Sequence, residues 1–258
     1  MRTFAKLLTL FAAVGLAACT NDVTEDLATT PDFAGGGSVK TLSVALDGAT
    51  RVALGEKTAE GMYPVEWQES DVLRINEGKT SAIAIGEDKS VANFTFAVAD
   101  TTEYHVVYPY VEGLTAVNAA CQPVEFATVQ NYTEGSFDTA SFPMYGHVAA
   151  EEGAPTLSSA SLDYLAGVLC LKAKGAGEVL TSITLSVSEG AIAGTFDVDC
   201  TSGDLTAHED ASKTMTYMLP EGGITLSETP AVFYIAVPAG DYKTMVAKLN
   251  TADVAMSL

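Results

Sequence analysis

The residues with the clearest chemistry lie near the start of the chain, in the sequence Leu16-Ala-Ala-Cys19. Small residues directly before a cysteine are typical of the lipobox of bacterial lipoprotein signals, in which the thiol is acylated before cleavage. A basic start and an apolar run, Leu7–Leu16, precede it, and this run is too short to span a bilayer as a permanent anchor. We therefore predict that residues 1–18 are a lipoprotein signal peptide and that Cys19 carries the lipid. An ordinary signal peptide with a chance cysteine is the alternative.

The other residue types that could do chemistry stand apart from one another. The three histidines, His105, His147 and His208, fall in no metal-ligand spacing. Asp197 and Asp199 could supply the two carboxylates that glycoside hydrolysis uses, but they alternate with an apolar set and are expected to face water. His105 is likewise expected on a solvated strand face. We predict no catalytic residue, no metal site and no cofactor, and a protein that is not an enzyme.

Beyond Cys19 the chain has three cysteines, an odd number for an exported protein. Either one pair forms and one thiol is left over, or Cys121, Cys170 and Cys200 are all free. Cys170 lies in the apolar run Leu165–Leu171, and Cys200 continues an inward-facing set of residues. We favour free, buried thiols, because buried cysteines behave as small apolar groups.

The chain is strongly acidic. It has 258 residues, with 13 Lys and Arg against 33 Asp and Glu and a formal net charge of −20. Since Arg2 and Lys6 leave with the signal peptide, the mature chain has 11 basic residues and a formal charge of −22. This balance argues against nucleic acid or an anionic membrane surface as a partner.

The elements that must position these residues are predicted to be β-strands, so the fold class is all-β. Apolar and polar residues alternate with period 2, most clearly in Phe94-Thr-Phe96 and Ile183-Thr-Leu185, and turn residues separate the segments. The predicted strands are 39–46, 51–54, 65–67, 72–76, 81–85, 91–98, 104–110, 124–126, 166–173, 179–188, 192–200, 214–219, 231–237, 242–249 and 254–258. Trp67, the only tryptophan, is expected in the core.

Two series of short strands, separated by a region rich in Pro and Gly, predict two β-sandwich domains in tandem. Residues 19–38, polar, acidic and then rich in glycine, are expected to form a flexible tether. The first domain is predicted over 39–150 and the second over 156–258. The sequence stops at Val254–Leu258 within a strand pattern, so we expect that the second sandwich is incomplete, that a partner completes it, or that the reading frame is truncated.

Several motifs in this order resemble the fimbrillin family, exported lipoproteins of Gram-negative anaerobes. The segments that carry the resemblance are Thr50–Gly55, Val65–Asn76, Phe142–Gly146, Leu162–Lys172, Ile183–Asp199 and Phe233–Tyr242. The resemblance implies two transthyretin-like β-sandwich domains and, for the best understood members, a role as type V pilus subunits on the outer membrane surface. It implies other fimbrial subunits as partners, outer-membrane lipid bound through Cys19, and a host or bacterial surface ligand.

In such pilus subunits an Arg-specific protease removes the tether with the first strand, and a strand of another subunit fills the groove. Arginine occurs only at Arg51 and Arg74 after the signal peptide, and Arg51 follows the first predicted strand. The resemblance therefore points to Arg51 as the processing site. It also points to Val44 and Leu46 as inward plugs of the first strand. The alternative is a surface arginine that is never cleaved.

A second function stays open at this point. The chain could be a tethered surface lipoprotein that binds a glycan and does not polymerise. Exposed aromatic side chains such as Tyr110, Tyr132 or Tyr145 would then stack against sugar rings. A concave surface with an exposed Tyr or Trp and ordered carboxylates would favour this reading.

Overall fold

The structure is a computed structural model and describes residues 37–46, 66–138, 141–252 and 255–257. These residues form β-strands joined by turns, which confirms the predicted all-β class. Within these ranges no helix has both the length and the apolar character needed to cross a membrane.

The described strands are numbered in chain order. The first ten are β1 Ser38–Ala45, β2 Arg74–Ile75, β3 Gly78–Lys79, β4 Ala82–Ile85, β5 Val91–Val98, β6 Glu103–Tyr108, β7 Cys121–Phe126, β8 Val129–Asn131, β9 Met144–Ala149 and β10 Thr156–Ser161. The others are β11 Asp163–Tyr164, β12 Ala166–Ala173, β13 Val179–Val187, β14 Gly194–Asp199, β15 Leu205–Ala207, β16 Thr214–Met218, β17 Ile224–Thr225, β18 Ala231–Pro238, β19 Met245–Thr251 and β20 Ala255–Ser257.

Two sheets pack against each other around the first core. One has the strand order β10-β1-β5-β4 and the other β11-β9-β6-β2-β3. Alternate residues of their strands meet between them, because successive side chains of a strand point to opposite faces. Trp67 lies at the centre, with its ring edge-on to Phe94 at 5.0 Å and to Tyr108 at 5.6 Å between centroids. The prediction that Trp67 belongs to the core is confirmed.

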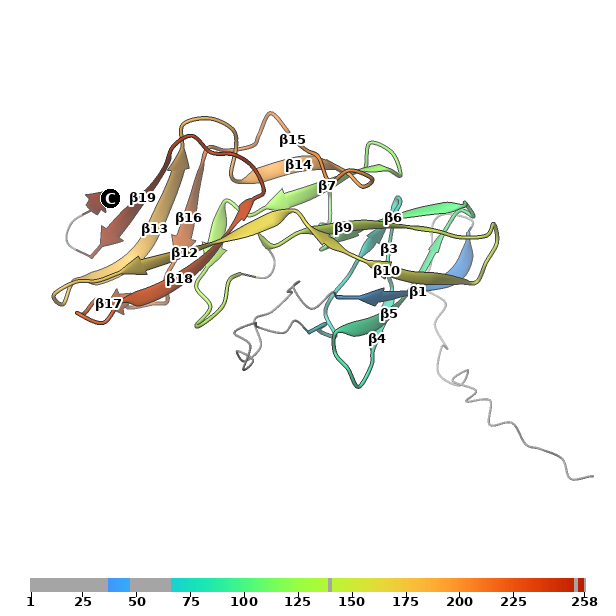
Figure 1. Cartoon of the computed structure of the whole chain (residues 1–258), viewed down its shortest axis with the longest axis horizontal. Helices are drawn as coiled ribbons and strands as arrows, with labels where there is room; N and C mark the ends of the chain where they lie inside the picture. The colour runs from blue at the N-terminus through green and yellow to red at the C-terminus, as the bar shows by residue number, and fades with distance from the viewer. Residues whose placement is uncertain (1–36, 47–65, 139–140, 253–254, 258) are drawn as a thin grey trace, which may run out of the picture. The chain divides into compact units, whose positions relative to one another are not determined.

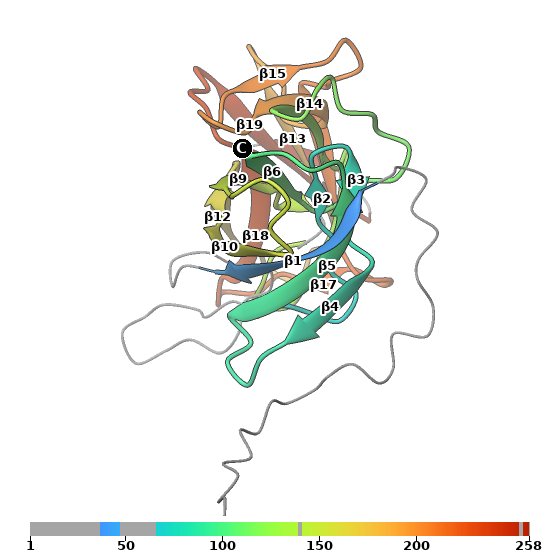
Figure 2. The ribbon, with the colours of Figure 1, turned by 90° about the vertical axis from the view of Figure 1, so that its right-hand side faces the viewer.

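Strand β1 is an interior strand of its sheet, with a neighbour on each side (Figure 2). It pairs antiparallel with β5 along its whole length, from Ser38 opposite Val98 to Ala45 opposite Val91. On its other side it runs parallel to β10, a strand more than a hundred residues later in the chain. Its register with β10 shifts between Leu42 and Val44.

A second core lies between the pair β12-β18 and the sheet β20-β19-β13-β16-β8, on which β17 also pairs with β13. Ile183, Leu185 and Val187 of β13 are buried there, as their alternation predicts. A third cluster packs around the sheet β15-β14-β7 and includes Val107 of β6. Strand β6 is therefore covered on both faces, because Tyr104 and Val106 belong to the first core.

Residues 156–173 form an extended run that takes part in three sheets in succession. β10 pairs with β1, β11 pairs with β9, and β12 pairs with β18. Figure 1 shows the run from β10 to β12 as one nearly continuous extended ribbon, with the short β11 between them. The domain bounds 39–150 and 156–258 stay a prediction. The strand pairings cross them, since β10 joins the sheet of β1 while β7 and β8 pair with β14 and β16.

One cysteine prediction is wrong in the structure. Cys200 is buried and Cys121 half-buried, but Cys170 is exposed, and all three are free. In β12 the neighbours Leu169 and Leu171 pack against the second core. The alternation of the strand then turns Cys170 to the opposite face.

Gly146 of β9 allows the extended run to pass close by. A Cβ atom on Gly146 would lie 2.7 Å from the carbonyl oxygen of Ser161 and 2.9 Å from Cδ2 of Leu162. Backbone and a packed side chain must both shift to accept it, so Gly146→Ala should lower the free energy of unfolding by about 1–3 kcal/mol. Urea denaturation followed by tryptophan fluorescence measures this loss.

Gly167 of β12 is the matched control, since a Cβ there meets no atom within 4 Å. Gly167→Ala should leave stability unchanged or raise it slightly, because the substitution restricts the unfolded chain. Equal effects of the two substitutions would contradict a close approach at Gly146.

Candidate functional site

The candidate site is the space between β5 and β10 that β1 fills, which we call the β1 slot. The inward side chains of β1 are Lys40, Leu42 and Val44, and Leu46 continues the series just after the strand. All four are buried. Val39, Thr41, Ser43 and Ala45 alternate with them and remain exposed or half-buried.

The β1 slot contributes much of the first core. Burying a Leu or Val side chain fully stabilises a protein by about 1.5–3 kcal/mol, so the three aliphatic residues of β1 contribute on the order of 5–9 kcal/mol. The net stability of a domain is of similar size, about 5–15 kcal/mol. Because strands are spaced about 4.8 Å apart, an empty slot would leave β5 and β10 separated by about 10 Å with unpaired backbone groups. The protein therefore requires a strand in this slot.

Lys40 occupies the one inward position that is not aliphatic. Its Nζ lies 2.7 Å from Oδ1 of Asp100, donates a hydrogen bond of 2.9 Å to the carbonyl oxygen of Ala154, and lies 5.8 Å from the ring centroid of Tyr104. Burial alone would lower the pKa of Lys40, but the hydrogen bond with Asp100 and the nearby Tyr104 raise it overall. Lys40 and, in turn, Ser38 lower the pKa of Asp100.

Sequence reasoning missed the role of Lys40, although its signal was present. The period-2 pattern that places Leu42 and Val44 inward also places Lys40 inward. A charged residue in a buried strand series indicates a partner elsewhere in the fold, because an unpaired buried charge is too costly.

The site residues predicted from the sequence fall into two groups. Cys19 and Arg51 lie outside the described residues. Val44 and Leu46 lie on the inward side of β1 and are buried in the first core. Their role as plugs of an exchangeable strand stays a prediction.

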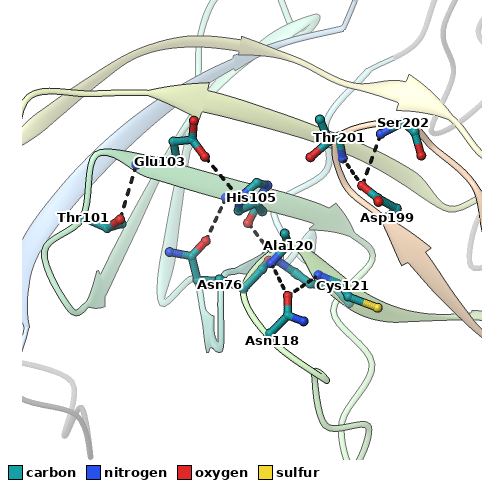
Figure 3. A network of polar contacts seen from close by, with 12 residues as sticks. Asn76, Thr101, Glu103, His105, Asn118, Ala120, Cys121, Asp199, Thr201 and Ser202 are labelled. Carbon is teal, nitrogen blue, oxygen red and sulfur yellow. Dashed lines mark hydrogen bonds and ion pairs between the residues drawn. The ribbon is translucent and has the colours of Figure 1, made fainter.

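A network of polar contacts joins Asn76, which follows β2, to β6 and to the start of β7 (Figure 3). Asn76, which has a left-handed backbone conformation with φ 49°, exchanges two hydrogen bonds of 2.8 Å with the backbone of His105. Nε2 of Gln122 donates to the carbonyl oxygens of His105 and Ala119. Asn118 accepts bonds from the backbone N–H groups of the next turn. The network holds the start of β7 against β6.

His105 is buried in this network, which corrects the prediction that it faces solvent. Alternation placed it opposite Tyr104 and Val106, but β6 is covered on its second face as well. Burial lowers the pKa of His105, Glu103 acts in the opposite direction, and His147 adds to the lowering. Nε2 of His105 lies 4.0 Å from Glu103, beyond hydrogen-bond distance.

The thiol and carboxylates near this network are engaged by other groups of the protein. Burial and the nearby carboxylates raise the pKa of Cys121, so its thiol is not activated. Asp199 accepts bonds from the backbone N–H groups of Thr201 and Ser202, and Asp197 lies 2.9 Å from His208. Both carboxylates therefore have partners within the fold. Within the described ranges no group of three His, Cys, Asp or Glu residues is placed to hold a metal ion.

A hollow of about 750 Å³ lies beside Tyr110, and Asp71, Lys79, Tyr108 and Glu112 also line it. The ring of Tyr110 is half-buried and has the guanidinium of Arg74 at 4.8 Å and Nζ of Lys79 at 5.4 Å. Oδ1 of Asp71 accepts a hydrogen bond of 3.0 Å from the hydroxyl of Tyr108. An aromatic ring with carboxylates nearby is suited to a sugar ring, although these groups already have partners inside the protein.

The other two candidate tyrosines have packing roles. The ring of Tyr132 contacts Tyr217 and Phe233 edge-on in the second core. Tyr145 packs against the third cluster.

No family model and no curated protein matches the chain. The chain is similar to a solved structure from Bacteroides ovatus named "putative cell adhesion protein", with 10% identity, 86% of each chain covered and a TM-score of 0.47. It is also similar to a "putative adhesin" from the same organism, with 12% identity, coverage of 85% of this chain and 81% of that one, and a TM-score of 0.39.

The buried His105 should make stability depend on pH. Because burial lowers its pKa, the folded protein binds fewer protons than the unfolded chain once the pH falls below the ordinary value of about 6.5. The free energy of unfolding should therefore decrease on acidification from pH 7 to pH 5.5, with a slope from this residue of at most about 1.4 kcal/mol per pH unit. Urea titrations at several pH values measure it.

The variant His105→Gln should flatten the decrease between pH 7 and pH 5.5. An unchanged slope in His105→Gln would show that His105 does not cause the pH dependence.

Proposed function

We propose that this chain is a surface-exposed fimbrial subunit, structural or accessory, that assembles by β-strand addition and contributes to adhesion. In this proposal Cys19 attaches the precursor to lipid of the outer membrane. Cleavage at Arg51 frees the tether with β1. Other subunits of the same or a related type then supply the strand that replaces it.

The observation that carries the proposal is the position of β1. It is the first described strand, yet it lies inside its sheet, between β5 and β10. One cut after β1 would leave it held only by hydrogen bonds and side-chain packing, since the rest of the chain follows the cut. A removable interior strand is the feature that strand exchange between subunits needs.

The chemistry of the slot also suits strand addition. An incoming strand would recover the backbone hydrogen bonds that β1 makes with β5 and β10, which supply affinity independent of sequence. The positions of Leu42, Val44 and Leu46 would receive alternate side chains and supply specificity. The resemblance to fimbrillins supports the same mechanism.

The alternative function is that of a tethered glycan-binding lipoprotein that does not polymerise. The hollow beside Tyr110 is the observation in its favour. Its ring and carboxylate groups interact with Arg74, Lys79 and Tyr108, so a sugar would have to compete with contacts that already exist. The β1 slot therefore gives stronger support to the pilus function.

Cleavage at Arg51 can be tested in the native cell. Unboiled outer-membrane fractions should give a ladder on an immunoblot that collapses on boiling to a band without residues 19–51, because many hydrogen bonds must break together. Arg51→Ala should abolish both the shorter band and the ladder, and Arg51→Lys should do the same if the protease is Arg-specific. Arg74 is buried and bonded to the carbonyl oxygens of Val111 and Leu114, so it is not an alternative site in the folded protein.

A normal shorter product from Arg51→Ala would remove Arg51 from the mechanism. A single uncleaved band in boiled and unboiled wild-type samples would instead indicate an anchor, a terminal accessory protein or a separate surface-binding lipoprotein.

The lipid attachment at Cys19 is tested separately. Cys19→Ala should lose incorporation of labelled palmitate and move from the detergent phase to the aqueous phase in Triton X-114 partition. Long acyl chains contribute about 0.8 kcal/mol per buried CH₂, so their loss should release the protein from membranes. Cys170→Ala changes an exposed cysteine and is the control. A Cys19→Ala protein that stays in the detergent phase would contradict the lipobox.

A further inference from the structure

The β1 slot contains a feature that strand exchange alone does not require, the buried ammonium group of Lys40. Its side chain is fully buried, whereas that of Asp100 is 41% exposed. Removing a charge from water costs several kcal/mol unless a close partner compensates for it. Lys40 therefore depends on the groups that surround its Nζ.

Those groups all belong to the body of the protein and none to β1. Asp100 follows β5, Tyr104 is in β6, and Ala154 lies in the turn between β9 and β10. Together they form what we call the Lys40 pocket. If β1 leaves, the pocket stays behind, with a carboxylate and a carbonyl oxygen that both accept hydrogen bonds from a cation.

The Lys40 pocket fixes the register of whatever strand fills the slot. A slip of one residue would turn the aliphatic side chains outward, so burial already opposes it. A slip of two residues keeps the alternation intact, and burial opposes it much less. In one direction such a slip brings Leu42 beside Asp100, and in the other it forces Lys40 into the apolar position of Leu42.

We propose that the Lys40 pocket selects the strand that fills the β1 slot, admitting one with Lys or Arg two residues before its first aliphatic plug. The proposal rests on the proposed function, since it names the chemistry of the replacing strand. The spacing is that of Lys40-Thr-Leu42-Ser-Val44 in β1 itself. A strand with an apolar or acidic residue at this place would leave the carbonyl of Ala154 without its donor, and Asp100 would keep only the hydroxyl of Ser38 and solvent.

The test uses the full chain cut after Arg51 by an arginine-specific protease, with fluorescent peptides of the sequence Ser38–Leu46 as probes. The peptide with Lys40 and its Lys40→Arg form should replace β1 and elute with the protein. The Lys40→Met peptide should be taken up about tenfold less, because it brings no cation to Asp100 and the carbonyl of Ala154. The Lys40→Glu peptide should be taken up less still, because its carboxylate is repelled by Asp100. Protein carrying Asp100→Asn should lose most of this preference.

Equal or better uptake of the Lys40→Met peptide by the wild-type protein would overturn the proposal, since well-packed apolar groups sometimes replace buried ion pairs without loss. A preference for Lys that persists in Asp100→Asn would overturn it too. If no peptide is taken up, the result contradicts strand exchange, which is the proposed function. The Lys40 pocket is then tested separately by stability measurements on the uncut chain.

On the uncut chain a double-mutant cycle measures the coupling of Lys40 and Asp100. Lys40→Met, Asp100→Asn and the double variant should show a coupling of about tenfold in the unfolding equilibrium constant. Lys89 and Glu66, an exposed pair at 3.0 Å, are the matched control, with a coupling below about fivefold. Coupling of Lys40 and Asp100 no larger than that of the control pair would overturn the pocket. If Lys40→Met does not fold, Lys40→Arg should still fold. In that variant Asp100→Asn should lower the free energy of unfolding as much as it does in the wild type.

Discussion

The pairing of β1 with β5 on one side and β10 on the other is the interaction on which the first core depends. It joins β10 to β5 and β4 in a sheet of four strands, and it places Leu42, Val44 and Leu46 in the core around Trp67. The pairing is parallel on the β10 side, so no short turn could join the two strands, and they come from distant parts of the chain. An interior strand at one end of the described chain is thus held by its neighbours and not by its connections.

The extended run of residues 156–173 spreads the consequences of that pairing through the fold. Among the described strands, β10 is an edge strand whose ladder partner is β1, and the same run continues into β11 and β12. Loss or replacement of β1 therefore removes or changes the partner of a segment that also pairs with β9 and β18. The three cores are separate clusters of side chains, but this run gives them a shared backbone element.

The sequence predicted the fold class and the strands that bury one face, and it failed where a strand has a second covered face. β5 and β12 begin and end at the predicted residues. β9 and β10 were missed, because a glycine interrupts the first and the second has serines at three of its six positions. His105 was placed in solvent because alternation tells which residues share a face and not what covers that face. The parallel partner of β1 has no local signal at all.

Lys40 shows why a stable core does not suffice for a strand that has to be placed correctly. An aliphatic residue at that position would bury more apolar surface, yet it would leave the series Leu42, Val44, Leu46 free to shift by two residues with its alternation intact. An ion pair with a buried ammonium gives little net stability, because desolvation of the ammonium offsets much of the attraction. What it supplies is a large difference between one register and the others, since only one register places the ammonium beside Asp100 and the carbonyl of Ala154. The charge therefore affects which register the strand adopts more than it affects the overall stability of the folded protein.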